Sequence, residues 1–227
     1  MDHSRIISAQ ERIYSTRFRE YGDTPQGVFW NNTETQYLRF ERLLRHTLGN
    51  APTAPALHEI GCGTAALFEY LKARSIACDY SGTDIVPDML EIAQKRHPEG
   101  KFYQRDVLTT DISEAYDFVV ASGVFNYRDR VKPETWNKYV EDMLSKMFSM
   151  ARCGIAFNFL TSNITIAPDP TLHYADPAVM LRFCQNRLSR FHVLDQSYPL
   201  YEVTLTVFKE AHIKGSFSSE AYGKYFA

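Results

Sequence analysis

Two hydrophobic periods alternate along the middle of the chain. Short apolar runs, which are typical of buried strands, occupy residues 55–60, 76–84, 101–106, 116–123 and 153–160. The segments between them repeat apolar residues every three or four positions, as helices do, and comprise residues 64–74, residues 87–97 and the stretch with Trp136, Tyr139, Met143 and Met147. Strands that alternate with helices predict a parallel sheet covered by helices on both faces.

The N-terminal region has no place in that sheet. An aromatic helix followed by a loop at residues 21–32 is expected first. Apolar residues then recur at helical spacing over residues 33–49, and Gly49 is expected to end this second helix. Residues 1–50 are therefore predicted to form a helical lid that belongs to the same domain as the sheet.

The C-terminal region also departs from the alternation. Asp176 and Pro177 suit the N-cap and the first turn of a helix. The two strands expected after it, at residues 191–196 and 201–209, are joined by a connection too short for a parallel crossover, so they should pair as an antiparallel hairpin. Residues 211–227 are weakly patterned and are treated as a tail without an assigned element.

Composition limits the partners and the location. The 227 residues suffice for one sizeable core, so residues 51–210 are predicted to form one domain with the lid. A net charge of -2 and a pI near 6.4 give no general attraction for nucleic acid or for an anionic membrane. Without a secretory signal or a run approaching ~18 apolar residues, a cytoplasmic protein is expected. The four cysteines form no CxxC pair, which argues against a disulfide framework or a metal site; a monomer and a homodimer remain open.

A glycine turn follows the first predicted strand, in the segment HEIGCGTAAL at residues 58–67. Gly61, Gly63 and Ala66 form a loose dinucleotide pattern, and Asp84 lies at the right distance to hold a ribose. Glu59 argues against a dinucleotide, because a carboxylate beside the turn would repel a pyrophosphate. The same carboxylate suits S-adenosylmethionine, which carries a sulfonium and an ammonium but no phosphate. The alternative is that Glu59 only accepts amide hydrogen bonds within the turn.

Several ordered motifs resemble those of the class I S-adenosylmethionine-dependent methyltransferases. The family's acid-x-Gly-x-Gly motif matches Glu59, Gly61 and Gly63, with Ala65 in place of the frequent third glycine. The resemblance covers roughly residues 55–209. It implies an α/β, Rossmann-like, doubly wound sheet of seven strands in the order 3-2-1-4-5-7-6, with the last strand antiparallel.

The resemblance also implies roles for individual residues. Asp84 would accept both ribose hydroxyls, and Asp106 would accept from the adenine amine. The other residues expected at the cofactor are Trp30, Arg39, Cys62, Ile85, Met89, Val107, Ser122 and the backbone of Gly123. Asp84 and Asp106 are also typical turn-capping residues, and this alternative stays open.

The lid and the loops opposite it are expected to enclose the reacting centre. Trp30 or Tyr14 would face the sulfonium with a ring, and Gln36 or Arg39 would hold the cofactor's carboxylate, Arg39 with the better geometry. The candidate catalytic residues are Tyr14, Asn126, Tyr127 and Tyr174. Further candidates for the acceptor pocket are Phe125, Asn158, His173, Tyr198 and Tyr201. Each aromatic residue could equally belong to the ordinary core.

Four functions fit these observations to different degrees. The leading one is a small-molecule methyltransferase of secondary metabolism that works by SN2 displacement without a metal. The chain is also similar to bacterial enzymes that cyclise S-adenosylmethionine itself to azetidine-2-carboxylate and methylthioadenosine. A non-catalytic S-adenosylmethionine-binding module is a third possibility. A nicotinamide-dependent oxidoreductase is the weakest of the four.

Overall fold

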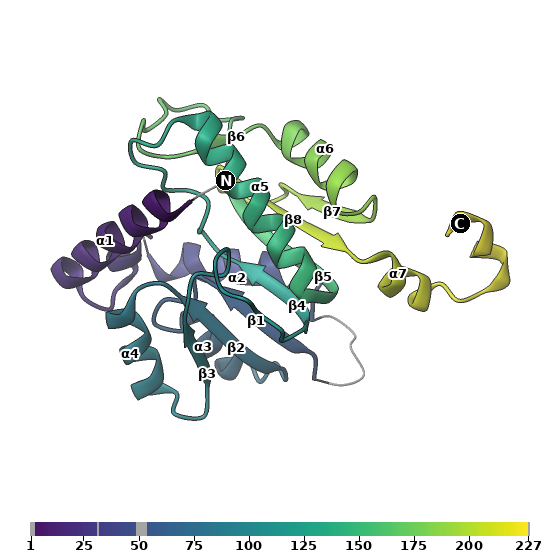
Figure 1. Cartoon of the computed structure of the whole chain (residues 1–227), viewed down its shortest axis with the longest axis horizontal. Coiled ribbons are helices and arrows are strands. Elements are labelled where there is room, and N and C mark those ends of the chain that lie inside the picture. The colour runs from purple at the N-terminus through teal and green to yellow at the C-terminus, as the bar shows by residue number, and fades with distance from the viewer. Residues whose placement is uncertain (1–2, 31, 49–53, 227) are drawn as a thin grey trace.

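A mixed β-sheet forms the centre of the molecule, and helices pack on both of its faces (Figure 1). The computed structural model describes residues 3–30, 32–48 and 54–226. The main path of the sheet runs β3-β2-β1-β4-β5-β8-β7. A further two-residue strand, β6 (Tyr174–Ala175), pairs with β5 outside this path. The predicted order is thus confirmed, and β6 is an addition that the sequence pattern did not indicate, because two residues are too few to show a period.

The parallel part of the sheet comes from the apolar runs that the sequence predicted as strands. Its members are β1 (Ala56–Ile60), β2 (Asp79–Asp84), β3 (Lys101–Gln104), β4 (Tyr116–Ala121) and β5 (Ala151–Thr161). The predicted hairpin consists of β7 (His192–Asp195) and β8 (Glu202–Phe208), with β8 antiparallel to both β5 and β7. The last strand is therefore antiparallel, as predicted.

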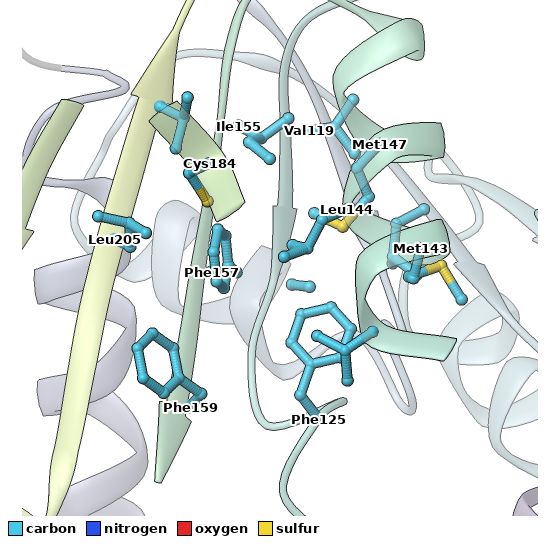
Figure 2. Close-up of a cluster of buried hydrophobic side chains, with 14 of the residues drawn as sticks. Val119, Phe125, Met143, Leu144, Met147, Ile155, Phe157, Phe159, Cys184 and Leu205 are labelled. Atoms are coloured by element: carbon cyan, nitrogen blue, oxygen red, sulfur yellow. The ribbon is translucent and has the colours of Figure 1, made fainter. Parts of the chain in front are cut away.

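Helices α5 (Pro133–Met150) and α6 (Pro177–Arg187) cover one face of the sheet. Figure 2 shows the core beneath them, where Leu144 of α5 and Cys184 of α6 lie near Phe157 of β5. The opposite face is covered by α2 (Thr33–Leu44) and α3 (Ala66–Ala73), which bury Leu43 and Leu67. The strands β1, β2, β4, β5 and β8 are thus buried on two sides, which explains their largely apolar runs, whereas the edge strands β3 and β7 are only partly buried.

The N-terminal region lies across the carboxyl end of the sheet. It comprises α1 (Ser4–Tyr21), the 3-10 helix η1 (Pro25–Val28) and α2, while α4 (Pro87–Arg96) flanks β2 and β3. His3, which precedes α1, has its Nε2 atom 2.8 Å from Asp142 Oδ2 on α5. Ile6 of α1 enters the same core as α5. The region predicted as a lid is thus anchored to the body at the start of α1.

The helix ends and the tail differ in part from the sequence expectations. The predicted helix over residues 33–49 ends at Leu44, and both Gly49 and the proposed domain boundary at residues 50 and 51 lie outside the described residues. The tail contains α7 (Glu210–Ser216) and the 3-10 helix η2 (Glu220–Tyr225), neither of which has buried residues. With no apolar face to bury, these helices leave no hydrophobic period. No helix in the described part of the chain has the length and hydropathy that a membrane span requires.

Candidate functional site

A cavity of about 320 Å³ opens at the carboxyl ends of β1, β2 and β4, under α1, η1 and α2. This is where parallel α/β sheets bind ligands, because the strand order reverses between β1 and β4. Its lining includes most of the predicted site residues: Tyr14, Trp30, Arg39, Glu59, Gly61, Cys62, Gly63, Asp84, Ile85, Met89, Asp106, Val107, Ser122, Asn126 and Tyr127. Gln36 and Gly123 line it as well.

The glycine turn between β1 and α3 is held in a left-handed backbone. Gly61 and Gly63 have φ angles of 71° and 53°. A Cβ added to Gly61 would lie 2.6 Å from the side chain of Val124, so a larger residue would meet both strain and a collision. Ala65, in place of the frequent third glycine, adopts φ 65° just before α3. The turn therefore has a left-handed backbone at Gly61, Gly63 and Ala65.

Asp84 ends β2 and faces the turn. Its Oδ2 accepts from the backbone N–H of Gly63 at 2.7 Å, and its Oδ1 accepts from that of Val86 at 2.9 Å. Burial raises the pKa of this carboxyl group, while the amide hydrogen bonds oppose the rise. Turn capping and ligand binding are compatible here, because a carboxylate has about four acceptor sites and the amide hydrogen bonds do not use all of them.

Glu59, at the end of β1, has a partner that the sequence did not indicate. Tyr80 of β2 donates its hydroxyl hydrogen bond to Glu59 Oε2. Gly82 is the residue paired with Glu59 across the strands, and a Cβ added there would lie 2.7 Å from the Cys62 side chain and 3.3 Å from the Tyr80 hydroxyl. Burial raises the pKa of Glu59 to about 8. The hydrogen-bond partner of Glu59 is thus the phenol of Tyr80 on the next strand rather than the turn amides considered as the alternative.

Asp106 follows β3 and also lines the cavity. Its Oδ1 accepts from Leu108 N at 2.9 Å, and its Oδ2 accepts from the Thr109 hydroxyl at 2.6 Å. Val107, the next residue, is buried against the core beneath α5. The carboxylate is therefore fixed by its own turn at the wall of the cavity.

An aromatic chain connects the N-terminal helices to the loop after β4. Phe29 meets Tyr14 edge-on at 5.2 Å between ring centroids and stacks on Tyr127 at 4.5 Å. Gln10 of α1 donates its Nε2 hydrogen bond to the Tyr127 carbonyl at 3.0 Å. Burial raises the pKa of Tyr14, so its hydroxyl stays protonated. Phe29 and Gln10 were missed from the sequence, because nothing local distinguishes them from core residues.

Trp30 and Arg39 close one end of the cavity together with a residue from the far end of the chain. The Arg39 guanidinium lies 4.2 Å above the Trp30 ring. Its Nε donates to both carboxylate oxygens of Glu202 on β8, at 2.8 and 2.9 Å. A Cβ added to Gly123 would lie 2.4 Å from the Trp30 ring, so this glycine makes room for the indole. Glu202 was not predicted, since a lone acid within an apolar strand carries no motif.

Several predicted residues lie elsewhere or hold the backbone. Tyr174 does not line the cavity; it lines a second hollow between α5 and α6, where its hydroxyl accepts from Asp169 N. Asn126 reaches the cavity but its Oδ1 accepts from Leu160 N, and Asn158 accepts from Gly123 N. The candidates that lie outside the lining of the cavity are Phe125, Asn158, His173, Tyr174, Tyr198 and Tyr201. Within residues 3–30, 32–48 and 54–226, no three His, Cys, Asp or Glu side chains are grouped closely enough to hold a metal ion.

Known proteins share both sequence and fold with this chain. A family model described as "Methyltransferase domain" matches residues 58–154. "Putative methyltransferase Rv1506c" of Mycobacterium tuberculosis (strain ATCC 25618 / H37Rv) is 35% identical over 161 residues, which are 70% of this chain and 96% of that protein.

Two solved structures show the same architecture at low identity. Magnesium protoporphyrin IX methyltransferase (ChlM) from Synechocystis PCC 6803 with bound SAH aligns with a TM-score of 0.64 and 14% identity, over 89% of this chain and 99% of that one. N-methyltransferase NodS from Bradyrhizobium japonicum WM9 in complex with S-adenosyl-l-homocysteine aligns with a TM-score of 0.61 and 20% identity, over 86% and 96% of the two chains.

Proposed function

Because the chain belongs to the class I S-adenosylmethionine-dependent methyltransferases, we propose that it transfers the methyl group of S-adenosylmethionine to a small-molecule acceptor. The charge of the cavity carries this proposal. Its lining includes Glu59, Asp84, Asp106 and Glu202, against two arginines that are both hydrogen-bonded to acids. A cavity with this excess of acids suits a sulfonium and disfavours a phosphate.

The residues around the cavity divide the task of binding. Asp84 receives the ribose hydroxyls, and Asp106 receives the adenine amine. Tyr14, Phe29 and Trp30 exclude water above the sulfonium, and Tyr14 or Trp30 presents a ring face to its charge. The carboxylate of the cofactor lies at Arg39. Tyr127, on the loop after β4, faces the incoming acceptor.

For methyl transfer, the protein mainly has to align the acceptor with the methyl group of the cofactor. The bound cofactor supplies a methyl carbon activated by positive sulfur: an acceptor lone pair forms the new bond, and the carbon–sulfur pair returns to sulfur. Asn126 holds the acceptor-side wall in place through its hydrogen bond to Leu160 N. A proton on the acceptor would leave to solvent, because neither Tyr14 nor Tyr127, whose pKa values burial raises, ionises near neutral pH.

Calorimetry and a methyl-transfer assay test the proposal. The purified protein should bind S-adenosylmethionine and S-adenosylhomocysteine, and isotopically labelled methyl should move to a member of a metabolite panel. An absence of binding to both adenosyl compounds would overturn the proposal. Binding without turnover across the panel would favour the non-catalytic module instead.

The affinity for S-adenosylmethionine should increase with pH between pH 6 and 7.5. Glu59, with its pKa raised to about 8 by burial, is mostly protonated in this range, and a bound cation favours its ionised form. Binding therefore releases a proton, so the dissociation constant falls as pH rises, by at most about tenfold per pH unit. Calorimetric titrations at pH 6.0, 6.5, 7.0 and 7.5 measure this slope.

The control for this prediction is Glu59→Gln, which removes the ionisable group and keeps the shape. Its slope should be much flatter than that of the wild type. S-Adenosylhomocysteine, which lacks the sulfonium, should also show a weaker slope. An equal slope in the wild type and the variant would assign the proton to another group.

A second candidate reaction, cyclisation of the cofactor, is favoured by the size of the cavity. About 320 Å³ is near the lower end of the range for small-molecule sites, roughly 300–1,000 Å³, and cyclisation needs no room for a separate acceptor. In this reaction the deprotonated amine of S-adenosylmethionine attacks its own γ-carbon. The carbon–sulfur bond breaks, and methylthioadenosine leaves with the electron pair.

Incubation with S-adenosylmethionine and no acceptor separates the two reactions. Mass spectrometry should find methylthioadenosine and azetidine-2-carboxylate in equal amounts if the chain is a cyclase. For a methyltransferase, neither product should exceed the level in a protein-free control, and S-adenosylhomocysteine should form only when an acceptor is added.

A further inference from the structure

A second hollow, with a volume of about 490 Å³, lies between α5 and α6 beside β6 (Figure 1). It is larger than the cofactor cavity and falls within the usual range for small-molecule sites, roughly 300–1,000 Å³. Its apolar lining includes Val140 of α5, Met180 and Phe183 of α6, and the rings of Pro168 and Pro170. A space of this size and character suits an apolar ring.

One buried polar side chain in the lining of this hollow lacks a partner. His173, which immediately precedes β6, is only 7% exposed. Its Nε2 atom is buried and has no hydrogen-bond partner among the described residues. Burial lowers the pKa of this histidine to about 4, so near pH 7 the ring is neutral and each ring nitrogen either donates or accepts. A buried polar atom without a partner is unfavourable, and a ligand hydroxyl, which both donates and accepts, would satisfy Nε2 in either tautomer.

The hollow and the cofactor cavity share a wall. Leu172 lines both spaces. Backbone contacts fix this wall to the loop after β4: Leu172 forms an antiparallel bridge with Tyr127, and His173 N donates to the Asn126 carbonyl at 2.8 Å. Asn126 and Tyr127 line the cofactor cavity. One molecule that reaches past Leu172 would therefore contact both spaces.

The charged residues of the hollow disfavour an anionic ligand. Glu141, Asp169 and Asp176 contribute three carboxylates to its lining. Arg128 also lines it, but its Nη1 and Nη2 atoms donate to two backbone carbonyls, at 2.7 and 2.9 Å. The balance of charge is therefore negative, and a neutral group is favoured over an anionic one.

We propose that this hollow binds the far end of an extended acceptor, an uncharged apolar ring that carries a hydroxyl group. The ring lies against the proline and phenylalanine side chains, and its hydroxyl pairs with His173 Nε2. The nucleophilic end of the same molecule extends past Leu172 into the cofactor cavity. This inference rests on the proposed function, because it assigns part of the acceptor for methyl transfer.

Three small probes in NMR titrations test the site: 4-methylphenol, toluene and 4-methylbenzoate. The protein is first saturated with S-adenosylhomocysteine, so that the cofactor cavity is already occupied. The ring nitrogens of His173 and the methyl groups of Val179 and Met180 report binding in the hollow. 4-Methylphenol should shift these signals and bind about fivefold more tightly than toluene, because of its hydrogen bond to Nε2. 4-Methylbenzoate should bind more weakly than 4-methylphenol.

The order of the two uncharged probes is decisive. Without a hydrogen bond in the hollow, toluene would bind more tightly than 4-methylphenol, because a hydroxyl is costly to remove from water. Tighter binding of toluene to the wild type, or no shift of the three reporting residues, would therefore overturn the inference.

Two variants separate recognition from folding. His173→Phe keeps a ring but removes Nε2, so toluene should now bind more tightly than 4-methylphenol. His46→Phe is the matched control, because His46 is exposed and lies outside both linings, and it should keep the wild-type order. Val179 lines the hollow and is 53% exposed, so Val179→Glu should fold and weaken both uncharged probes by at least about fivefold. Should His173→Phe fail to fold, Val179→Glu and the wild-type order still decide.

Competition connects the hollow to the acceptor. In methyl-transfer assays, 4-methylphenol should inhibit competitively against the acceptor but not against S-adenosylmethionine, and Val179→Glu should raise the KM for the acceptor. An unchanged order of the probes in His173→Phe, or inhibition competitive with S-adenosylmethionine, would refute the inference. Failure to bind S-adenosylhomocysteine in the first step would instead contradict the proposed function.

Discussion

Replacement of Asp84 by asparagine should weaken the binding of S-adenosylmethionine by at least about 100-fold, or ~2.7 kcal/mol. The wild-type carboxylate is oriented by the Gly63 and Val86 amides. Its remaining acceptor sites are expected to receive two ribose hydroxyls, and hydrogen bonds to a charged group contribute about 1.5–3 kcal/mol each. The variant amide has one acceptor oxygen and places a donor against a backbone N–H. The hydrogen bonds to the backbone amides and those expected to the ribose hydroxyls are therefore both weakened. Calorimetric titration measures the loss.

Asp88→Asn is the matched control for this prediction. Asp88 is of the same residue type and lies in the first turn of α4, outside the lining of the cavity. It pairs with Arg19 at 3.0 Å, with both side chains well exposed, so its loss should change affinity less than about twofold, as for most surface ion pairs. Retained affinity in Asp84→Asn, with an unfolding temperature like that of the wild type, would refute the assigned role of Asp84.

Trp136→Ala should destabilise the folded protein by about 3–5 kcal/mol, the range for truncation of a buried aromatic side chain. Trp136 is 0% exposed and packs 5.1 Å from Tyr139 between ring centroids. Its Nε1–H also donates to the Phe125 carbonyl at 3.1 Å, so truncation removes a partner from the loop that leads to the site. At about 2–4 °C per kcal/mol for a chain of this size, the unfolding temperature should fall by roughly 6–20 °C.

The other tryptophan provides the comparison. Trp30 is only partly buried and lies over the cavity against Arg39 and Gly123. Trp30→Ala should therefore lower the free energy of unfolding by less than half as much as Trp136→Ala does. Relative to that loss of stability, Trp30→Ala should weaken cofactor binding more. Denaturant unfolding and calorimetry on both variants measure this contrast. Equal losses of stability in the two variants would mean that Trp30 is an ordinary core residue.

The fold was predictable from the sequence because its determinants are local. The apolar run that became β1 and the three- to four-residue spacing that became α5 each need only neighbouring residues to be recognised. The same locality holds for the turn at Gly61 and Gly63 and for Asp84 at the end of β2. Parallel connections bring strand ends to one edge, so these motifs had to meet there.

Some side-chain contacts could not be predicted, because they depend on which residues the folded backbone brings together. Tyr174 was expected at the site, yet the short strand β6 places it at the hollow beside α6. The hydrogen bond between Tyr80 and Glu59 depends on the register of β1 against β2. No spacing along the chain encodes such a register.

The sequence by itself determined the α/β architecture, the glycine turn and the acids at the strand ends, since periodicity and turn chemistry act over a few residues. Only the tertiary structure decided the partners of those acids and the pairing of Arg39 with Glu202. That pair joins α2 to β8 across 163 residues. Such a contact forms only when the antiparallel strand closes the sheet beneath the N-terminal helices, and it therefore leaves no local pattern.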